Sequence, residues 1–304
     1  MKRIGVLLVN YRQWELSRRC VESLLGSRGV EVVPALVDNA SPGPVPEWVC
    51  STQGLVFHRS DANEGLTAGN NRAFGLLEGL APDEVLILNN DTEVEPDAIA
   101  LLSTYLGAHP EVGIAAPAIL RADDPGVVWS AGGTLMPRLM RSRQEYALAS
   151  DLPAEPVEVS FASGCAMLLR TGDFSRVGLQ DPGLFVYCED NDLCFRITGI
   201  GMRIHLVPAS RVYHHGAASV GGELSPLAVY LTHRNRYIVA ARYLGRTDLA
   251  LFTAYYSLVT LIKTGLLPMR GRAGLVPWIW RAALHGMRGR AGVPPVELLD
   301  RGEG

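Results

Sequence analysis

The residues Asn89 to Thr92 directly follow a run of four apolar residues in the segment VLILNNDTEVEP, which begins at Val85. The apolar run predicts a buried strand, so the polar cluster lies at a strand end. A carboxylate such as that of Asp91 is an oxygen ligand for a hard divalent cation. The alternative is that Asp91 and Thr92 cap the helix expected near Pro96, but a cap does not require the two asparagines. We therefore predict a ligand site here.

A second cluster, in FVYCEDNDLCFR, holds the carboxylates of Glu189, Asp190 and Asp192 where a helix is expected to begin. Negative charge is favourable at a helix N-terminus, so one of the acids could serve as a cap. That role accounts for one carboxylate and not for three. A positioned carboxylate can instead take the proton from an attacking hydroxyl, which makes this cluster a candidate general-base site.

Two histidines, His214 and His215, follow an apolar run in RVYHHGAAS. A single carboxylate at Asp91 makes a thin metal site, so either imidazole is a candidate second ligand. A nitrogen ligand would shift the metal preference from Mg²⁺ toward Mn²⁺. The alternative is an ordinary polar residue at a strand end.

The elements that must position these clusters alternate along the first 120 residues. Short apolar runs predict strands at residues 4–9, 32–37, 55–58, 85–88 and 113–116, and helical spacing occurs at 11–27, 63–80 and 96–109. This alternation predicts a mostly parallel sheet with helices on both faces. Ligands bind beyond the carboxyl ends of the strands in such sheets, and polar clusters follow the first four strands.

The composition limits the function classes. With 304 residues and 48% hydrophobic content, the chain can bury a sizeable core. A formal net charge of -3 argues against a general nucleic-acid binder. Five cysteines without a C-x-x-C pair fit reduced thiols in the cytoplasm better than a disulfide framework. The first turn, NYRQWE, lacks the G-x-G-x-x-G fingerprint of dinucleotide-binding domains.

Several motifs occur in one order along the chain, namely LLVNYRQ, LVDNASPG, NEGLTAGNNRAF, LILNNDTEVEPDAI, the long segment from SGCAMLLR to YHHGAAS, and YLTHRNRYIVAARY. From residue 4 to about 244 the sequence resembles family-2 glycosyltransferases of the GT-A fold, most of all the rhamnosyltransferase-type branch that builds bacterial surface polysaccharides. The resemblance implies an α/β, Rossmann-like sheet and an inverting, metal-dependent transfer. The sugar would pass from a UDP- or dTDP-sugar to a hydroxyl of a cell-surface polysaccharide or lipid-linked glycan.

The resemblance also implies residue roles. The NNDT segment matches a degenerate D-x-D motif that binds a divalent metal, Mn²⁺ or Mg²⁺, on the donor diphosphate. Asp91 and His214 would be the metal ligands, with His215 as the second choice for the histidine. The E-D-x-D pattern makes Asp190 the general base, and Glu189 and Asp192 would orient the acceptor or the helix.

The remaining strand-end clusters fit donor recognition. Asp38 could accept from N3–H of uracil or thymine, although a local turn leading into Pro42 is the alternative. The other residues implied in donor binding are Asn10, Tyr11, Asn63, Gly65, Gly69, Asn70 and Asn90. Arg234 could touch the diphosphate or orient the acceptor, but a solvated surface role is the alternative that its residue type favours.

Two other functions compete with this one. A processive synthase or a polyprenyl-phosphate sugar transferase is one, but a processive synthase would carry a Q-x-x-R-W segment and several membrane spans. A non-catalytic sugar-nucleotide or glycan-binding homologue is the other. Such a homologue would be expected to have lost Asp91, Asp190 or His214, and all three are present.

The C-terminal part, residues 221–304, is predicted to be a helical subdomain following a catalytic domain of residues 1–220. Leu249 to Ile262 carries no charge, and we expect Lys263 and Pro268 to end that helix before it could span a bilayer. Between Asp248 and Glu297 there are six basic residues and no acidic one. With Trp278 and Trp280, this pattern favours a segment lying on an anionic membrane surface at the inner face of the cell membrane. The alternatives are a packed subdomain with solvated arginines or a contact within a homo-oligomer.

Overall fold

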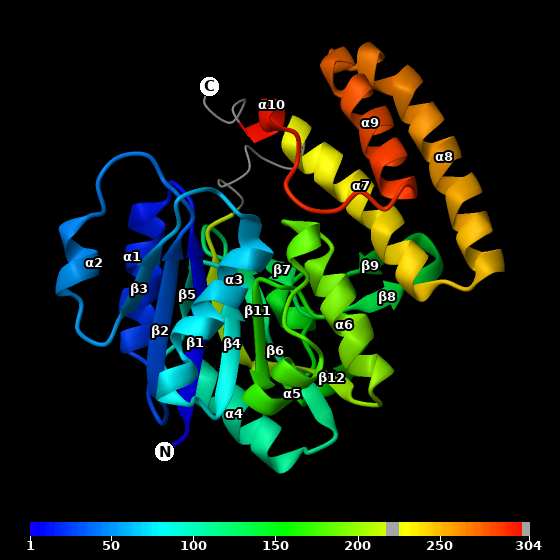
Figure 1. The fold of residues 1–304 in the computed structure, drawn as a ribbon. Coiled ribbons are helices and arrows are strands. Elements are labelled where there is room, and N and C mark those ends of the chain that lie inside the picture. Colours follow the sequence, from blue (N-terminus) through cyan, green and yellow to red (C-terminus); the bar gives the residue numbers. More distant parts are fainter. Residues whose placement is uncertain (217–224, 300–304) are drawn as a thin grey trace.

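The computed structural model describes residues 1–216 and 225–299 (Figure 1). The described residues form a ten-stranded sheet in the order β10-β12-β6-β11-β4-β1-β2-β3, with β5 added to β12 and β7 added to β6. Its N-terminal half is parallel and consists of β1 (Arg3–Asn10), β2 (Glu31–Asp38), β3 (Val56–Arg59) and β4 (Glu84–Leu88). These strands agree with the predicted ones to within two residues at each end.

Helices cover both faces of this sheet, as predicted. Alternate residues of a strand point to opposite faces, and in β1 Val6 and Leu8 join one core cluster whereas Leu7 joins the other. The first cluster includes residues of α1 (Trp14–Leu25) and α4 (Ala98–Ala108). The second includes residues of α3 (Gly65–Leu76) and α6 (Glu189–Gly199). Because both faces are covered, the strands read as continuous apolar runs.

The other half of the sheet is mixed. The strand β11 (Ala166–Arg170) lies antiparallel between β4 and β6 (Val112–Arg121), and β12 (Arg203–His214) runs parallel to β6. The three-residue strand β5 (Thr92–Val94) pairs antiparallel with the end of β12. Further short elements are α2 (Glu47–Ser51), β7 (Val128–Ser130), β8 (Thr134–Met136), β9 (Arg141–Arg143), β10 (Val157–Val159), α5 (Thr171–Arg176) and α10 (Val296–Leu299).

Three longer helices follow the sheet, namely α7 (Pro226–Tyr243), α8 (Arg246–Met269) and α9 (Val276–Met287). The predicted cap of α7 is confirmed, because the Ser225 side chain accepts a hydrogen bond from the Ala228 amide at 3.1 Å and Pro226 occupies the first turn. The predicted boundary between domains at 220 and 221 falls in 217–224, outside the described residues, and stays a prediction.

The predicted end of the next helix is wrong. Helix α8 continues through Lys263 and Pro268 and ends at Met269. A proline removes one intrahelical hydrogen bond but keeps its carbonyl as an acceptor, and here the Gly271 amide donates to the Pro268 carbonyl at 3.0 Å. With 24 residues, α8 is long and apolar enough to cross a membrane by length and composition, which corrects the expectation that this helix would end before it could span a bilayer.

Candidate active site

Asn10, at the end of β1, is the centre of a buried polar network. Its amide nitrogen donates to the Asp38 carboxylate at 2.8 Å and to the Ser41 hydroxyl at 3.1 Å. The side-chain oxygen of Asn10 accepts from the Ser17 hydroxyl at 2.9 Å and from the backbone amide of Gln13 at 3.1 Å. Strand pairing places Asn10 opposite Asp38. The network therefore fixes the ends of β1 and β2 and the start of α1 relative to one another.

The Asp38 carboxylate is fully buried and already has protein partners on both oxygens. Besides Asn10, it receives hydrogen bonds from the amide and hydroxyl of Ser41, and the Arg59 Nε lies 3.3 Å from its Oδ2. Asp38 thus holds the turn that follows β2, which is close to the local role left open by the sequence. Tyr11 is half-buried, with the Arg12 guanidinium 4.9 Å from its ring centre. Contact of Asp38 or Tyr11 with a base stays a prediction.

Asn63 and Gly65 join the ends of β2 and β3 to α3. The Asn63 side-chain oxygen accepts from the Asn39 amide nitrogen at 2.8 Å and from the Gly65 backbone at 3.0 Å. A Cβ on Gly65 would lie 2.6 Å from the Phe185 ring, and φ there is 87°. Only glycine fits this close approach between α3 and the segment that precedes α6.

Gly69 and Asn70 also face protein atoms in the structure. A Cβ on Gly69 would lie 2.7 Å from the Val9 side chain, so the small residue lets α3 pack closely on β1. The buried Asn70 amide nitrogen donates to the Gln180 side chain at 2.9 Å. Contact of Gly69 and Asn70 with the nucleotide stays a prediction, since their contacts in the structure are with Val9 and Gln180.

Asp91 and His214 are brought together by the pairing of β5 with β12. That pairing sets Thr92 opposite His214 and places the buried Asp91 carboxylate 3.2 Å from the His214 Nε2. His215 points elsewhere, with its Nε2 2.6 Å from the Glu93 carboxylate. Of the two histidines, the structure therefore pairs His214 with Asp91.

This pair fits a divalent cation as part of a coordination sphere. Among residues 1–216 and 225–299, no group of three or more potential metal ligands occurs, so a cation would complete its sphere with donor phosphate oxygens and water. The Nδ1 of His214 has no hydrogen-bond partner among the described residues. The centres of the Trp129 and His214 rings are 4.2 Å apart. One carboxylate and one imidazole suit Mn²⁺ better than Mg²⁺. Asn90, in contrast, donates to the Ser17 hydroxyl at 2.8 Å and belongs to the buried network.

The acid cluster begins α6, as expected. Asp190 is partly exposed, and its carboxylate accepts from the Asn191 amide at 2.8 Å. Glu189 is buried, and its Oε2 has no hydrogen-bond partner among the described residues. Burial, with the Asp190 charge adding to it, raises the pKa of Glu189 to about 8, and burial raises the pKa of Asp190 as well. Both acids lie against Gly164, where a Cβ would be 3.4 Å from each.

Asp192 has a different environment. Its carboxylate accepts from the Arg196 Nε at 2.9 Å, from the Tyr243 hydroxyl at 2.8 Å and from the Arg242 guanidinium at 3.1 Å. The bond to Arg196 lies within α6, and the bonds to Tyr243 and Arg242 join α6 to α7. Of its two predicted roles, orienting the acceptor or orienting the helix, the contacts support the second.

The segment before α6 adopts backbone angles that non-glycine residues rarely adopt. Phe185, Tyr187 and Cys188 have φ of 67°, 70° and 66°. Residues with such angles persist where contacts with the surrounding structure hold the backbone in place. Asn235 of α7 does this by donating to the carbonyls of Leu184, Val186 and Tyr187. The sequence alone does not predict this role for Asn235, whose one signal is its position beside Arg234.

Arg234 supports the same segment from inside. It is 1% exposed, and its guanidinium donates to the carbonyls of Gly183, Leu184 and Gly292. The solvated role considered as its alternative is wrong, because the side chain is buried. Its predicted contact with diphosphate or acceptor stays a prediction. The structure shows a residue that positions the backbone leading to Asp190.

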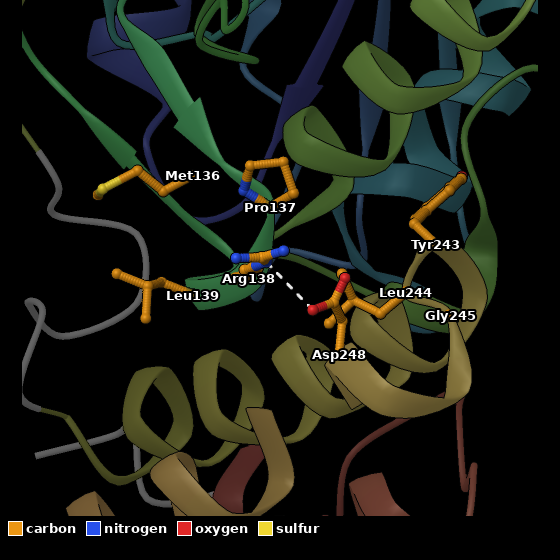
Figure 2. Close-up of a pocket in the computed structure, with 8 residues that line it drawn as sticks. All are labelled: Met136, Pro137, Arg138, Leu139, Tyr243, Leu244, Gly245 and Asp248. Carbon is orange, nitrogen blue, oxygen red and sulfur yellow. Dashed lines mark ion pairs between the residues drawn. The ribbon is translucent and has the colours of Figure 1, made fainter. Parts of the chain in front are cut away.

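A cavity of about 540 Å³ lies between residues 136–139 and the junction of α7 with α8 (Figure 2). Residues 136–139 line one side, and Tyr243, Leu244, Gly245 and Asp248 line the other. An ion pair of 3.1 Å joins Arg138 to Asp248 across it. The hydroxyl of Tyr243 links this cavity to Asp192, two residues from Asp190.

The fold is that of the GT-A glycosyltransferases. Solved structures with a similar fold include GalNAc-T7 with UDP, GalNAc and Mn²⁺, with a TM-score of 0.60 and 18% identity, covering 84% of this chain and 55% of that one. The mannosyltransferase PcManGT from Pyrobaculum calidifontis, in complex with GDP-Man and Mn²⁺, gives a TM-score of 0.57 and 15% identity, covering 94% and 87%.

Sequence relatives agree with this class. The hexosyltransferase Agl10 of low-salt glycan biosynthesis in Haloferax volcanii is 25% identical over 300 residues, 96% of this chain and 93% of its own. The N-acetylglucosaminyl-diphospho-decaprenol L-rhamnosyltransferase of Mycobacterium tuberculosis is 30% identical over 243 residues, 72% of this chain and 77% of its own. Residues 47–240 match the family model described as glycosyltransferase like family 2. The chain belongs to this family and is a glycosyltransferase, so the predicted family, fold class and enzyme class are confirmed.

Proposed function

We propose that this enzyme transfers a sugar, with rhamnose as the first candidate, from a UDP- or dTDP-sugar to a hydroxyl of a lipid-linked or cell-surface glycan, with inversion at the anomeric carbon. The name of the mycobacterial relative supports rhamnose and a lipid-linked acceptor. The observation that carries the mechanism is the pair of neighbouring acids at the start of α6, one partly exposed and one buried.

Asp190 is the general base in this proposal. Its carboxylate takes the proton of the acceptor hydroxyl while that oxygen bonds to the anomeric carbon and the bond to the donor diphosphate breaks. Glu189, with a pKa of about 8, keeps its proton at neutral pH. A protonated Glu189 carries no negative charge to repel that of Asp190, so Asp190 can be ionised when the acceptor binds.

Asp91 and His214 would hold the divalent cation, and Mn²⁺ is favoured over Mg²⁺. The cation supplies positive charge for the leaving nucleoside diphosphate. The buried network around Asn10 and Asp38 keeps the strand ends rigid, and a rigid frame positions the donor for attack at low entropic cost. A lipid-linked acceptor would be met at the inner face of the cell membrane, and we propose a peripheral location there.

A panel of UDP- and dTDP-sugars tests this function, with polyprenyl-diphosphate glycans as acceptors and mass spectrometry of the products. We expect one donor to give an acceptor product heavier by one sugar, in the presence of Mn²⁺. Donor binding without any product would instead favour a non-catalytic homologue. Transfer onto plain polyprenyl phosphate would favour a polyprenyl-phosphate sugar transferase.

A further inference from the structure

Helices α8 and α9 form a hairpin that stands away from the sheet, beyond α7 (Figure 1). The side of α8 that faces the body buries Phe252, Tyr256 and Thr260. The solvent-exposed side carries large apolar side chains, and six of them recur at intervals of three or four residues, so these six share one face of the helix. We call this set the α8 apolar face, and its members are Leu251, Tyr255, Leu258, Ile262, Leu266 and Met269.

The α8 apolar face is unusually long for a water-exposed surface. Leu251, Leu258 and Ile262 are 62%, 55% and 52% exposed. From Leu251 to Met269 the face extends about 27 Å along the helix axis. On α9, Trp280, Leu284 and Met287 are also exposed, and the Trp280 indole N–H donates to Thr264 of α8 at 2.9 Å. Exposed apolar patches of this length mark interaction surfaces.

Beyond Asp248 in the first turn of α8, the charge on the hairpin has one sign. Every charged residue from 249 to 296 is basic. Arg270 and Arg272 lie at the turn between the helices, whereas Arg288 and Arg290 follow the end of α9, and all four are exposed. The hairpin therefore presents an apolar centre with cationic ends, which complements a surface that is apolar inside and anionic at its boundary.

We propose that the α8–α9 hairpin docks on an anionic lipid bilayer, with the α8 apolar face at the acyl boundary and the arginines at the headgroup phosphates. This inference rests on the proposed lipid-linked acceptor, whose hydroxyl the docked enzyme would meet at the membrane surface. A symmetric contact between two copies through the hairpin would bring their arginines together, which is unfavourable. A spanning α8 would place Lys263, 3.4 Å from His233 of α7, inside the hydrocarbon region at high cost.

The test is flotation of the full-length protein with vesicles of phosphatidylcholine alone or with phosphatidylglycerol added. We expect binding only to the anionic vesicles, weakened by salt because exposed charges are screened. The variant Leu258→Glu with Ile262→Glu should lose binding. The matched control Leu101→Glu changes an exposed leucine of α4 and should bind as the unmodified chain does. Replacing Arg270 and Arg272 with glutamine should weaken binding about thirtyfold.

Sedimentation velocity and a transfer assay separate the remaining outcomes. A concentration-dependent dimer that Leu258→Glu abolishes, without vesicle binding, would overturn the inference in favour of a second copy. Equal binding to neutral and anionic vesicles would overturn the electrostatic part. Sugar transfer to a water-soluble acceptor should be the same in Leu258→Glu and Leu101→Glu. Vesicle binding without any transfer would contradict the proposed function and leave the docking surface supported.

Discussion

Buried acids occur in two regions, at the ends of β1 and β2 and at the start of α6. The two regions differ in how well the carboxylates are hydrogen-bonded. Asp38 has hydrogen-bond partners on both carboxylate oxygens and a nearby arginine. Glu189 has an oxygen without a partner among the described residues, and the segment before it holds three residues at positive φ. The carboxylate of the first region is thus fully hydrogen-bonded. The second region combines an unpartnered carboxylate oxygen with strained backbone angles. Reactive groups are expected in the second kind of environment.

The largest effect is expected from the substitution that tests which acid at the start of α6 is the general base. Asp190→Asn should lower transfer by about 10²–10⁴-fold, because it removes the general base and keeps the shape of the side chain. Donor affinity, measured by calorimetry, should stay unchanged, since the variant leaves Asp91 and the β1–β2 network intact. Turnover close to that of the unmodified enzyme would assign the base to another residue, with Glu189 and Asp192 the next candidates.

The metal pair should give the next largest effect. Asp91→Ala should abolish metal-stimulated transfer, and His214→Ala should raise the Mn²⁺ concentration for half-maximal activity by about tenfold or more. His215→Ala is the matched control, because His215 pairs with Glu93 and not with Asp91. Mn²⁺ binding in the presence of the nucleoside diphosphate, followed by electron paramagnetic resonance, checks the order. Full activity in excess chelator, or the reverse order of the two histidines, would contradict the proposed ligands.

Asp192→Asn should act on stability more than on chemistry. It weakens the bond to Arg196 within α6 and the bonds to Arg242 and Tyr243 that join α6 to α7. Because both arginines are partly exposed, we expect a loss of about 1–3 kcal/mol in the free energy of unfolding. Urea denaturation measures this loss. A folded variant with unchanged stability and a sharply raised acceptor KM would instead show that Asp192 contacts the acceptor.

Glu189→Gln should give the smallest effect, and the size of its effect on stability depends on pH. The folded-state pKa of Glu189, about 8, lies above its value in the unfolded chain. The folded protein therefore holds a proton that the unfolded chain releases, and this carboxyl lowers stability as pH rises between the two values. Glutamine does not titrate, so the variant should melt several degrees higher than the unmodified enzyme near pH 8.5 and about equally near pH 5. The exposed Glu155→Gln is the control, and a pH-independent difference would contradict the buried, protonated state.

The parallel half of the sheet could be predicted from the sequence because burial on both faces leaves continuous apolar runs. The five-residue helix α2 and the three-residue strand β5 were missed, since elements this short carry too few residues for a periodic pattern. The end of α8 was misplaced because a proline near the last turn costs only one hydrogen bond. Arg234 reads as a surface cation in sequence, and only packing of α7 against the segment 183–187 buries it.

The sequence by itself determined the family, the strand ends that carry polar residues and the two acid-containing motifs, because motif order and apolar spacing are properties of the chain. Only the tertiary structure decided which of those residues lie together and what surrounds each one. The pairing of Asp91 with His214 and not with His215 depends on the register of β5 against β12, which sets Thr92 opposite His214. The contrast between Glu189, Asp190 and Asp192 depends on what packs around each carboxylate. Three adjacent acids are alike in sequence, and burial and hydrogen-bond partners, which come from distant segments, make them different.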